Sequence, residues 1–133
     1  MFLTRDQILS ADDTSKRVTV PVPEWADGGE VLVGIMEGHQ RDKFEVEYSK
    51  AREGKSPHGI RGWLAAATLI DESGKRLFSP ADIAALSRKS SIPLDRIWEA
   101  ATKLNGLTQA DVEALQKNFP AAPSGDSGSS SPE

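Results

Sequence analysis

The chain has 133 residues, a net charge of −4 and no cysteine. Its length suits one domain with one hydrophobic core, and the lack of cysteine excludes a disulfide framework, a thiolate zinc site and a cysteine nucleophile. Acidic and basic residues are interspersed, so the sequence has no basic stripe that could bind a nucleic acid backbone. No apolar run approaches the roughly 20 residues that cross a bilayer, and residues 1–6 do not resemble a secretory signal. We therefore expect a cytoplasmic protein without a nucleic-acid or membrane partner.

The N-terminal third predicts a short helix followed by a β-hairpin. Residues 4–10 form the helix, which Thr4 caps. Residues 17–22 carry valine at every second position, which indicates a half-buried strand, and the prolines at 21 and 23 place that strand at a sheet edge. A turn at Asp27-Gly28-Gly29 leads into a second strand at residues 30–36. Such a hairpin needs helices against its apolar face.

Helical patterns dominate the remainder of the chain. Residues 37–52 predict a charged helix, and residues 60–70 predict a buried one after a loop. Ser79-Pro80 begins a short helix, and residues 93–105 predict another that ends at Gly106. A last helix is predicted from Thr108 to about residue 119.

From Pro120 the composition changes to serine, glycine and proline without any large apolar residue. Such a segment buries too little surface to offset its ordering entropy, so we expect a disordered tail over residues 120–133. The predicted fold class is α+β. It consists of one mainly helical domain over residues 1–119, with an N-terminal β-hairpin packed on helices.

The sequence offers little catalytic chemistry. His39 and His58 lie near loop boundaries without a second ligand at metal spacing, and no phosphate-binding glycine loop is present. The Gly-x-x-Gly of residues 59–62 resembles an RNA clamp only in its bare form. Carboxylate pairs such as Glu45 and Glu47 fit a solvated surface better than an acid–base site. We expect no enzyme activity, no cofactor and no metal.

Two tryptophans are the candidate partner-binding residues. Trp98 falls within the apolar stripe of its helix and is expected in the core, and the spacing of Trp63 also matches a packed face. Trp25 lies in a polar turn, where it either folds over the hairpin or stands exposed as an anchor. Because tryptophan is enriched at binding hot spots, Trp25 and Trp63 are the residues that we assign to partner binding.

Five segments of the chain follow one another in a recognisable order. They are residues 2–9 (FLTRDQIL) with Asp12-Asp13, 20–25 (VPVPEW), 37–45 (EGHQRDKFE), 69–78 (LIDESGKRLF) and 104–108 (LNGLT). This order resembles the tail assembly chaperones of long-tailed bacteriophages and prophages. The similarity covers about residues 1–118 and departs at residues 91–94, where a proline resets a helix start.

The resemblance implies a function for the chain. Such chaperones bind the aggregation-prone tape measure protein, promote polymerisation of the tail tube around it and are absent from the finished virion. Many exist in two forms, because a ribosomal frameshift appends a domain that binds the tail tube protein. The chain fits the short form. Self-association is compatible with lining a filament, although no residue pattern demonstrates it. The alternatives are a tail structural or completion protein retained in the particle, and a small enzyme built on an unrecognised carboxylate pair.

Overall fold

The valine-rich hairpin forms the edge of a three-stranded antiparallel sheet in the computed structural model, which describes residues 1–107. Strand β1 (Arg17–Pro21) pairs with β2 (Glu30–Gly34), and β2 pairs with β3 (Leu69–Ile70). Gly28 adopts a φ of +71° in the connecting turn, a conformation that glycine reaches without a steric penalty. The predicted hairpin and the edge position of its first strand are confirmed.

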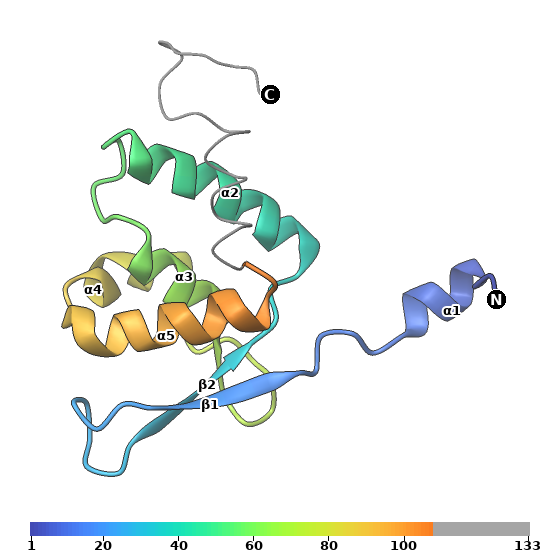
Figure 1. Ribbon diagram of the computed structural model, residues 1–133, viewed down its shortest axis with the longest axis horizontal. Helices are drawn as coiled ribbons and strands as arrows, with labels where there is room; N and C mark the ends of the chain where they lie inside the picture. The colour runs from blue at the N-terminus through green and yellow to red at the C-terminus, as the bar shows by residue number, and fades with distance from the viewer. Residues whose placement is uncertain (108–133) are drawn as a thin grey trace.

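Helices pack against this sheet and against one another (Figure 1). Helix α5 contacts both β1 and β2, while α3 packs on α4 and α5, and α2 packs on α3. In chain order the elements are α2 (Gly38–Arg52), α3 (Arg61–Thr68), the 3-10 turn η1 (Pro80–Asp82), α4 (Ile83–Ser87) and α5 (Ser91–Leu104). The predicted α+β class is confirmed. The helix predicted from Thr108 and the tail predicted for residues 120–133 lie outside the described residues.

Helix α5 begins two residues earlier than its sequence predicts. Ser90 caps it by accepting a hydrogen bond from the Ile92 backbone N–H at 3.2 Å. Pro93 is tolerated in the first turn because an N–H there has no partner within the helix. The helix ends where predicted, with Gly106 at a φ of +73°.

The helix predicted over residues 60–70 is wrong at its C-terminal end. Helix α3 stops at Thr68, and the two buried residues that follow form strand β3. Leu69 lies opposite Val33, and Ile70 lies opposite Leu32. A short apolar run cannot be assigned to helix or strand from periodicity alone. Here hydrogen bonding to β2 makes these two residues a strand.

The core lies where α3, α5 and the sheet meet. Its fully buried members include Phe44, Leu64, Leu69 and Ile97, which come from four different elements. No helix within residues 1–107 is long and apolar enough to cross a membrane.

Helix α1 (Arg5–Ser10) stands apart from this core (Figure 1). The predicted cap is present: the Thr4 hydroxyl accepts from the Gln7 backbone N–H at 3.2 Å, and the Gln7 side chain accepts from the Thr4 N–H at 2.9 Å. Every residue from 1 to 19 is exposed. Local capping therefore forms this helix without burying any of it.

Candidate protein-binding site

An aromatic cluster joins three helices at the centre of the domain. Phe44 of α2 is completely buried, and its ring centroid lies 5.8 Å from that of Tyr48, 6.0 Å from Trp63 of α3 and 6.1 Å from Trp98 of α5. These separations are typical of favourable ring packing. Trp63 and Trp98 each keep one part in the core and another part at the surface. Both tryptophans therefore pack as their helix patterns predict while remaining reachable from outside.

The exposed part of Trp63 lines an apolar groove of about 420 Å³. Its lining comes from the first turns of α2, from α3 and from the segment that leads into α4. The apolar lining residues are Trp63, Ala66, Ala67, Phe78, Pro80 and Ile83. We call this surface the Trp63 groove. The small side chains of Ala66 and Ala67 leave room for another chain to approach.

The polar rim of the Trp63 groove is basic. Its charged lining residues are Lys43 and Arg76, with His39 beside them, and no carboxylate lines it within the described part of the chain. The Arg76 guanidinium donates a hydrogen bond to the Gln40 side chain. Partial burial lowers the pKa of Arg76, and the nearby Glu37 carboxylate opposes that shift. The groove therefore combines apolar walls with positive charge, an arrangement that suits an apolar helix face bordered by carboxylates.

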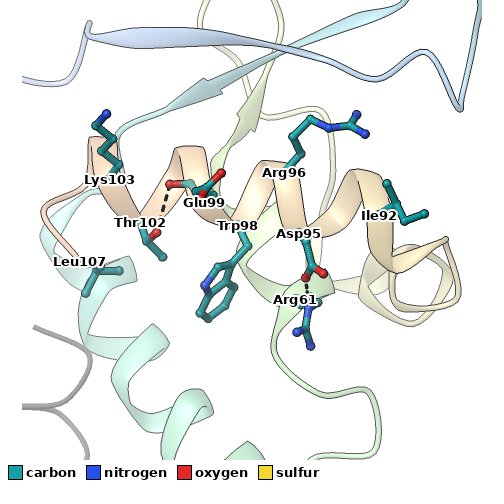
Figure 2. A pocket seen from close by; sticks show the side chains of 9 residues that line it. All are labelled: Arg61, Ile92, Asp95, Arg96, Trp98, Glu99, Thr102, Lys103 and Leu107. Atoms are coloured by element: carbon teal, nitrogen blue, oxygen red, sulfur yellow. Dashed lines mark hydrogen bonds and ion pairs between the residues drawn. The ribbon is translucent and has the colours of Figure 1, made fainter. Parts of the chain in front are cut away.

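A second groove of about 610 Å³ runs along α5 and is more polar (Figure 2). Trp98 points from α5 into this space, and Thr102 and Lys103 line its far end. Arg61 and Asp95 form an ion pair at the other end. Because charged side chains line much of this groove, it offers less apolar surface to a partner than the Trp63 groove does.

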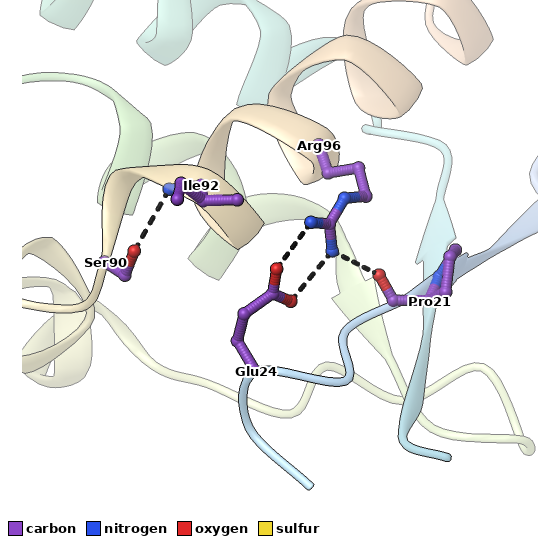
Figure 3. Close-up of polar contacts among 5 residues, drawn as sticks. All are labelled: Pro21, Glu24, Ser90, Ile92 and Arg96. Carbon is purple, nitrogen blue, oxygen red and sulfur yellow. Dashed lines mark hydrogen bonds and ion pairs between the residues drawn. The ribbon is translucent and has the colours of Figure 1, made fainter. Parts of the chain in front are cut away.

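Trp25 is held in the loop between β1 and β2. It is partly buried against the core, and its backbone N–H donates to the Val22 carbonyl at 3.0 Å. The neighbouring Glu24 accepts two hydrogen bonds from Arg96 of α5, at 3.0 and 2.7 Å, and Arg96 also donates to the Pro21 carbonyl at 2.7 Å (Figure 3). The loop is thereby fastened to α5. Trp25 does not line the Trp63 groove, so the two candidate residues do not share one site.

Four carboxylates in the described residues are tied into local structure. Arg96 hydrogen bonds lower the pKa of Glu24 to about 2, assisted by a backbone hydrogen bond. The Ser73 hydroxyl and turn backbone N–H groups lower the pKa of Asp71. Glu45 pairs with Arg41 at 3.5 Å, and Glu47 pairs with Lys50 at 3.3 Å. A general acid at neutral pH needs a raised pKa, and both shifts run the opposite way.

The histidines and the Gly-x-x-Gly segment, the other candidates for chemistry in the sequence, lie in exposed or structural positions. His39 lies 2.7 Å from the Glu37 carboxylate on the surface, and His58 is exposed in a loop. Gly62 is buried within α3, so residues 59–62 do not form an open clamp loop. Among residues 1–107, no group of three or more histidine or acidic side chains converges on one point that could hold a metal.

Sequence reasoning missed most of the groove. It singled out Trp63 but not Arg76, Phe78 or Ile83, which come from a segment of mixed turn, 3-10 and helical structure. The available signal was the group of large apolar residues between 77 and 86, which are Leu77, Phe78, Ile83 and Leu86. That signal does not reveal which helix faces them.

No protein-family model and no curated protein matches this sequence. The architecture, helices packed on a three-stranded antiparallel sheet, nevertheless has a counterpart among solved structures. The chain is similar in structure to the tail assembly chaperone of bacteriophage HK97, with a TM-score of 0.54 and 19% sequence identity over 74% of this chain and 90% of that one. The resemblance expected from the segment order is thus confirmed at the level of the fold.

Proposed function

We propose that the chain is a tail assembly chaperone of a bacteriophage or prophage, which acts in the cytoplasm of the bacterial host without catalysis. The fold shared with the HK97 chaperone is the observation that carries this proposal, because it covers most of both chains.

The partner that we propose is the tape measure protein. A long helical tape measure exposes apolar stripes that must be covered before the tail tube encloses them. The Trp63 groove fits one face of such a helix, since amphipathic helices bind by laying apolar side chains into grooves of this kind. Many copies along one target would raise the total avidity even if each contact is weak.

Trp63 is the proposed anchor and Trp25 is a proposed second contact on the hairpin side. Half-buried tryptophans of this kind are held rigid by the core and still present surface to a partner. A longer frameshifted form would add contact with the tail tube protein, with residues 120–133 as its junction. Release of the target then requires no nucleotide, because the polymerising tube displaces the weak contacts.

Co-expression with the tape measure protein of the same tail gene cluster tests this function. We expect the chain to raise the soluble yield of that protein and to co-purify with it. Particles purified after assembly should lack the chain when analysed by mass spectrometry. An unchanged soluble yield without a complex would contradict the chaperone role, and stoichiometric presence in particles would identify a structural or completion protein instead.

A matched pair of tryptophan variants tests the Trp63 groove. Trp63 and Trp98 contact the same Phe44 ring at nearly equal distances, and only Trp63 lines the groove. Trp63→Leu should weaken tape measure binding about tenfold or more, as expected for truncation of a hot-spot residue. Trp98→Leu should lose comparable stability and bind almost normally. Equal loss of binding in both variants would argue against the groove as the contact surface.

A further inference from the structure

The N-terminal arm exposes an apolar surface that nothing in the described residues covers. Phe2, Leu3, Ile8 and Leu9 are each more than half exposed. They surround a helix that has no buried residue and that projects away from the body of the domain (Figure 1). Single exposed apolar residues are ordinary, but a contiguous group on one short segment marks an interaction surface.

The arm is also too short to be a stable helix alone. Helix α1 has six residues, whereas isolated helices shorter than about 12–15 residues are marginal in water. The Thr4 and Gln7 hydrogen bonds favour its first turn only. A packed apolar face is the usual source of helix stability in proteins. An apolar surface on which the arm docks would therefore stabilise it.

A groove of about 830 Å³ between β1 and α5 offers such a surface. Val18 and Val20 contribute apolar side chains from the strand, and Ala100 and Leu104 contribute them from the helix. The groove contains the edge strand of the sheet, because β1 pairs only with β2 among residues 1–107. We call this surface the β1–α5 groove. It is separate from the Trp63 groove, with which it shares no lining residue.

The charges of the arm and of this groove are opposite. The β1–α5 groove is lined by Lys16 and Lys103 against the single carboxylate Glu99, and by Arg96, whose charge is already paired with Glu24. Side chains of residues 2–13 carry three carboxylates, Asp6, Asp12 and Asp13, against the single cation Arg5. Complementary charge of this kind favours encounter and fixes orientation, while the apolar contacts supply the affinity.

We propose that the N-terminal arm of one copy docks in the β1–α5 groove of a second copy. The arm continues outward from the N-terminal end of β1 (Figure 1), and Lys16 of the groove lies at its root. Docking on its own groove requires the short polar linker of residues 11–16 to reverse direction, whereas docking on a second copy requires no reversal. Exchange of a terminal segment is a low-cost route to association between identical chains. The inference rests on the proposed function, in which many copies lie along one target, but not on the Trp63 groove.

Three single substitutions in the full chain test this contact by sedimentation velocity over a range of concentrations. Ile8→Asp disables the arm, Val18→Asp disables the groove, and Val46→Asp on α2 is the control. Ile8 is 58% exposed and Val46 is 54% exposed, so the two changes are matched in chemistry and burial. We expect the first two variants to self-associate about tenfold more weakly or worse, since each puts a carboxylate in place of an aliphatic side chain that docking would bury. Val46→Asp should behave as the unmodified chain does.

Mixing the two defective variants provides the decisive result. The Ile8→Asp chain keeps an intact groove and the Val18→Asp chain keeps an intact arm, so together they should form a heterodimer that neither forms alone. Circular dichroism and thermal unfolding verify that both variants fold.

An unmodified chain that is monomeric at all concentrations overturns the inference, even if its arm is protected from proteolysis. An Ile8→Asp variant that loses tape measure binding while self-association persists also overturns it, because the arm then serves the tape measure. Loss of tape measure binding by Trp63→Leu alone leaves the arm contact standing.

Discussion

Asn105, the residue that ends α5, accepts a hydrogen bond from the backbone N–H of Met36 at 2.7 Å. These two residues are 69 positions apart in sequence. The Asn105 amide also donates to the Gly34 carbonyl at 3.2 Å and to the Ala101 carbonyl at 2.9 Å. One side chain thus joins the end of α5 to the exit of strand β2, at the point where the chain turns toward α2.

Replacing Asn105 with alanine should lower the free energy of unfolding by about 1–3 kcal/mol. The change leaves the partly buried Met36 N–H and Gly34 carbonyl without their partner, and an unsatisfied group costs more than an average hydrogen bond gains. Urea denaturation followed by circular dichroism measures this loss. Lys103→Ala, an exposed change on the same helix, should stay within about 0.5 kcal/mol of the unmodified chain. Equal stability of both variants would show that water replaces the Asn105 contacts.

Gly62 should not accept a side chain, because α3 and α4 approach each other closely there. A Cβ atom at Gly62 would collide with the Ser87 hydroxyl and would lie 3.0 Å from the Ser87 backbone nitrogen and 3.1 Å from the Ile83 carbonyl oxygen. Backbone atoms cannot move aside cheaply, so Gly62→Ala should destabilise the protein by about 1–3 kcal/mol. Chemical denaturation provides the measurement.

Gly38 provides the matched control for this glycine. It lies at the start of α2, and a Cβ there would meet nothing within 4 Å. Gly38→Ala should therefore stabilise the protein by up to about 1 kcal/mol, since alanine favours the helix and restricts the unfolded chain. If the two substitutions had the same sign, the close approach of α3 and α4 would not be the cause.

Much of the fold could be predicted because its signals are local. Alternating valines define β1, the spacing of Leu94, Ile97 and Ala101 defines the buried face of α5, and Gly106 marks the end of that helix. Strand β3 could not be predicted in the same way. Its two residues continue the apolar run of α3, and only pairing with β2, far away in sequence, makes them a strand.

The candidate site was less accessible to sequence reasoning than the fold. Trp63 matches a core position and is indeed packed on Phe44, yet its other edge lines a groove. That exposure depends on how far apart Lys43 and Phe78 lie, and no spacing within either segment encodes this distance. The Glu24–Arg96 contact likewise joins residues 72 positions apart.

The Glu24–Arg96 pair should make stability depend on pH in the acid range. Hydrogen bonds from Arg96 lower the pKa of Glu24 from 4.5 to about 2 in the folded protein. Between these values the unfolded chain binds more protons than the folded one, so stability falls as the pH decreases from about 5 to 2. Glu24→Gln should be less stable than the unmodified chain at pH 7, and the difference should shrink toward pH 2. Urea midpoints across this range measure the effect, with Glu99→Gln on α5 as the carboxylate control. A constant difference between the unmodified chain and Glu24→Gln would show that the pair does not titrate with folding.

Reversing one charge at the rim of the Trp63 groove should weaken tape measure binding without affecting the fold. Lys43 is exposed on α2 and lines the groove, whereas Lys89 is exposed beyond the end of α4 and does not. Lys43→Glu should weaken the complex about two- to fivefold at low salt, the range expected for an exposed ion pair, and Lys89→Glu should not.

Salt concentration separates this electrostatic effect from a change in packing. Screening at about 0.5–1 M salt should bring the affinity of Lys43→Glu close to that of the unmodified chain, because charges more than a few ångströms apart no longer interact there. The Trp63→Leu defect should persist at the same salt, since apolar contacts are not screened. Titration of each variant with the tape measure protein, at two salt concentrations and with matched thermal unfolding curves, measures both effects. Equal affinities of the Lys43 and Lys89 variants at low salt would place the tape measure contact on another face of the domain.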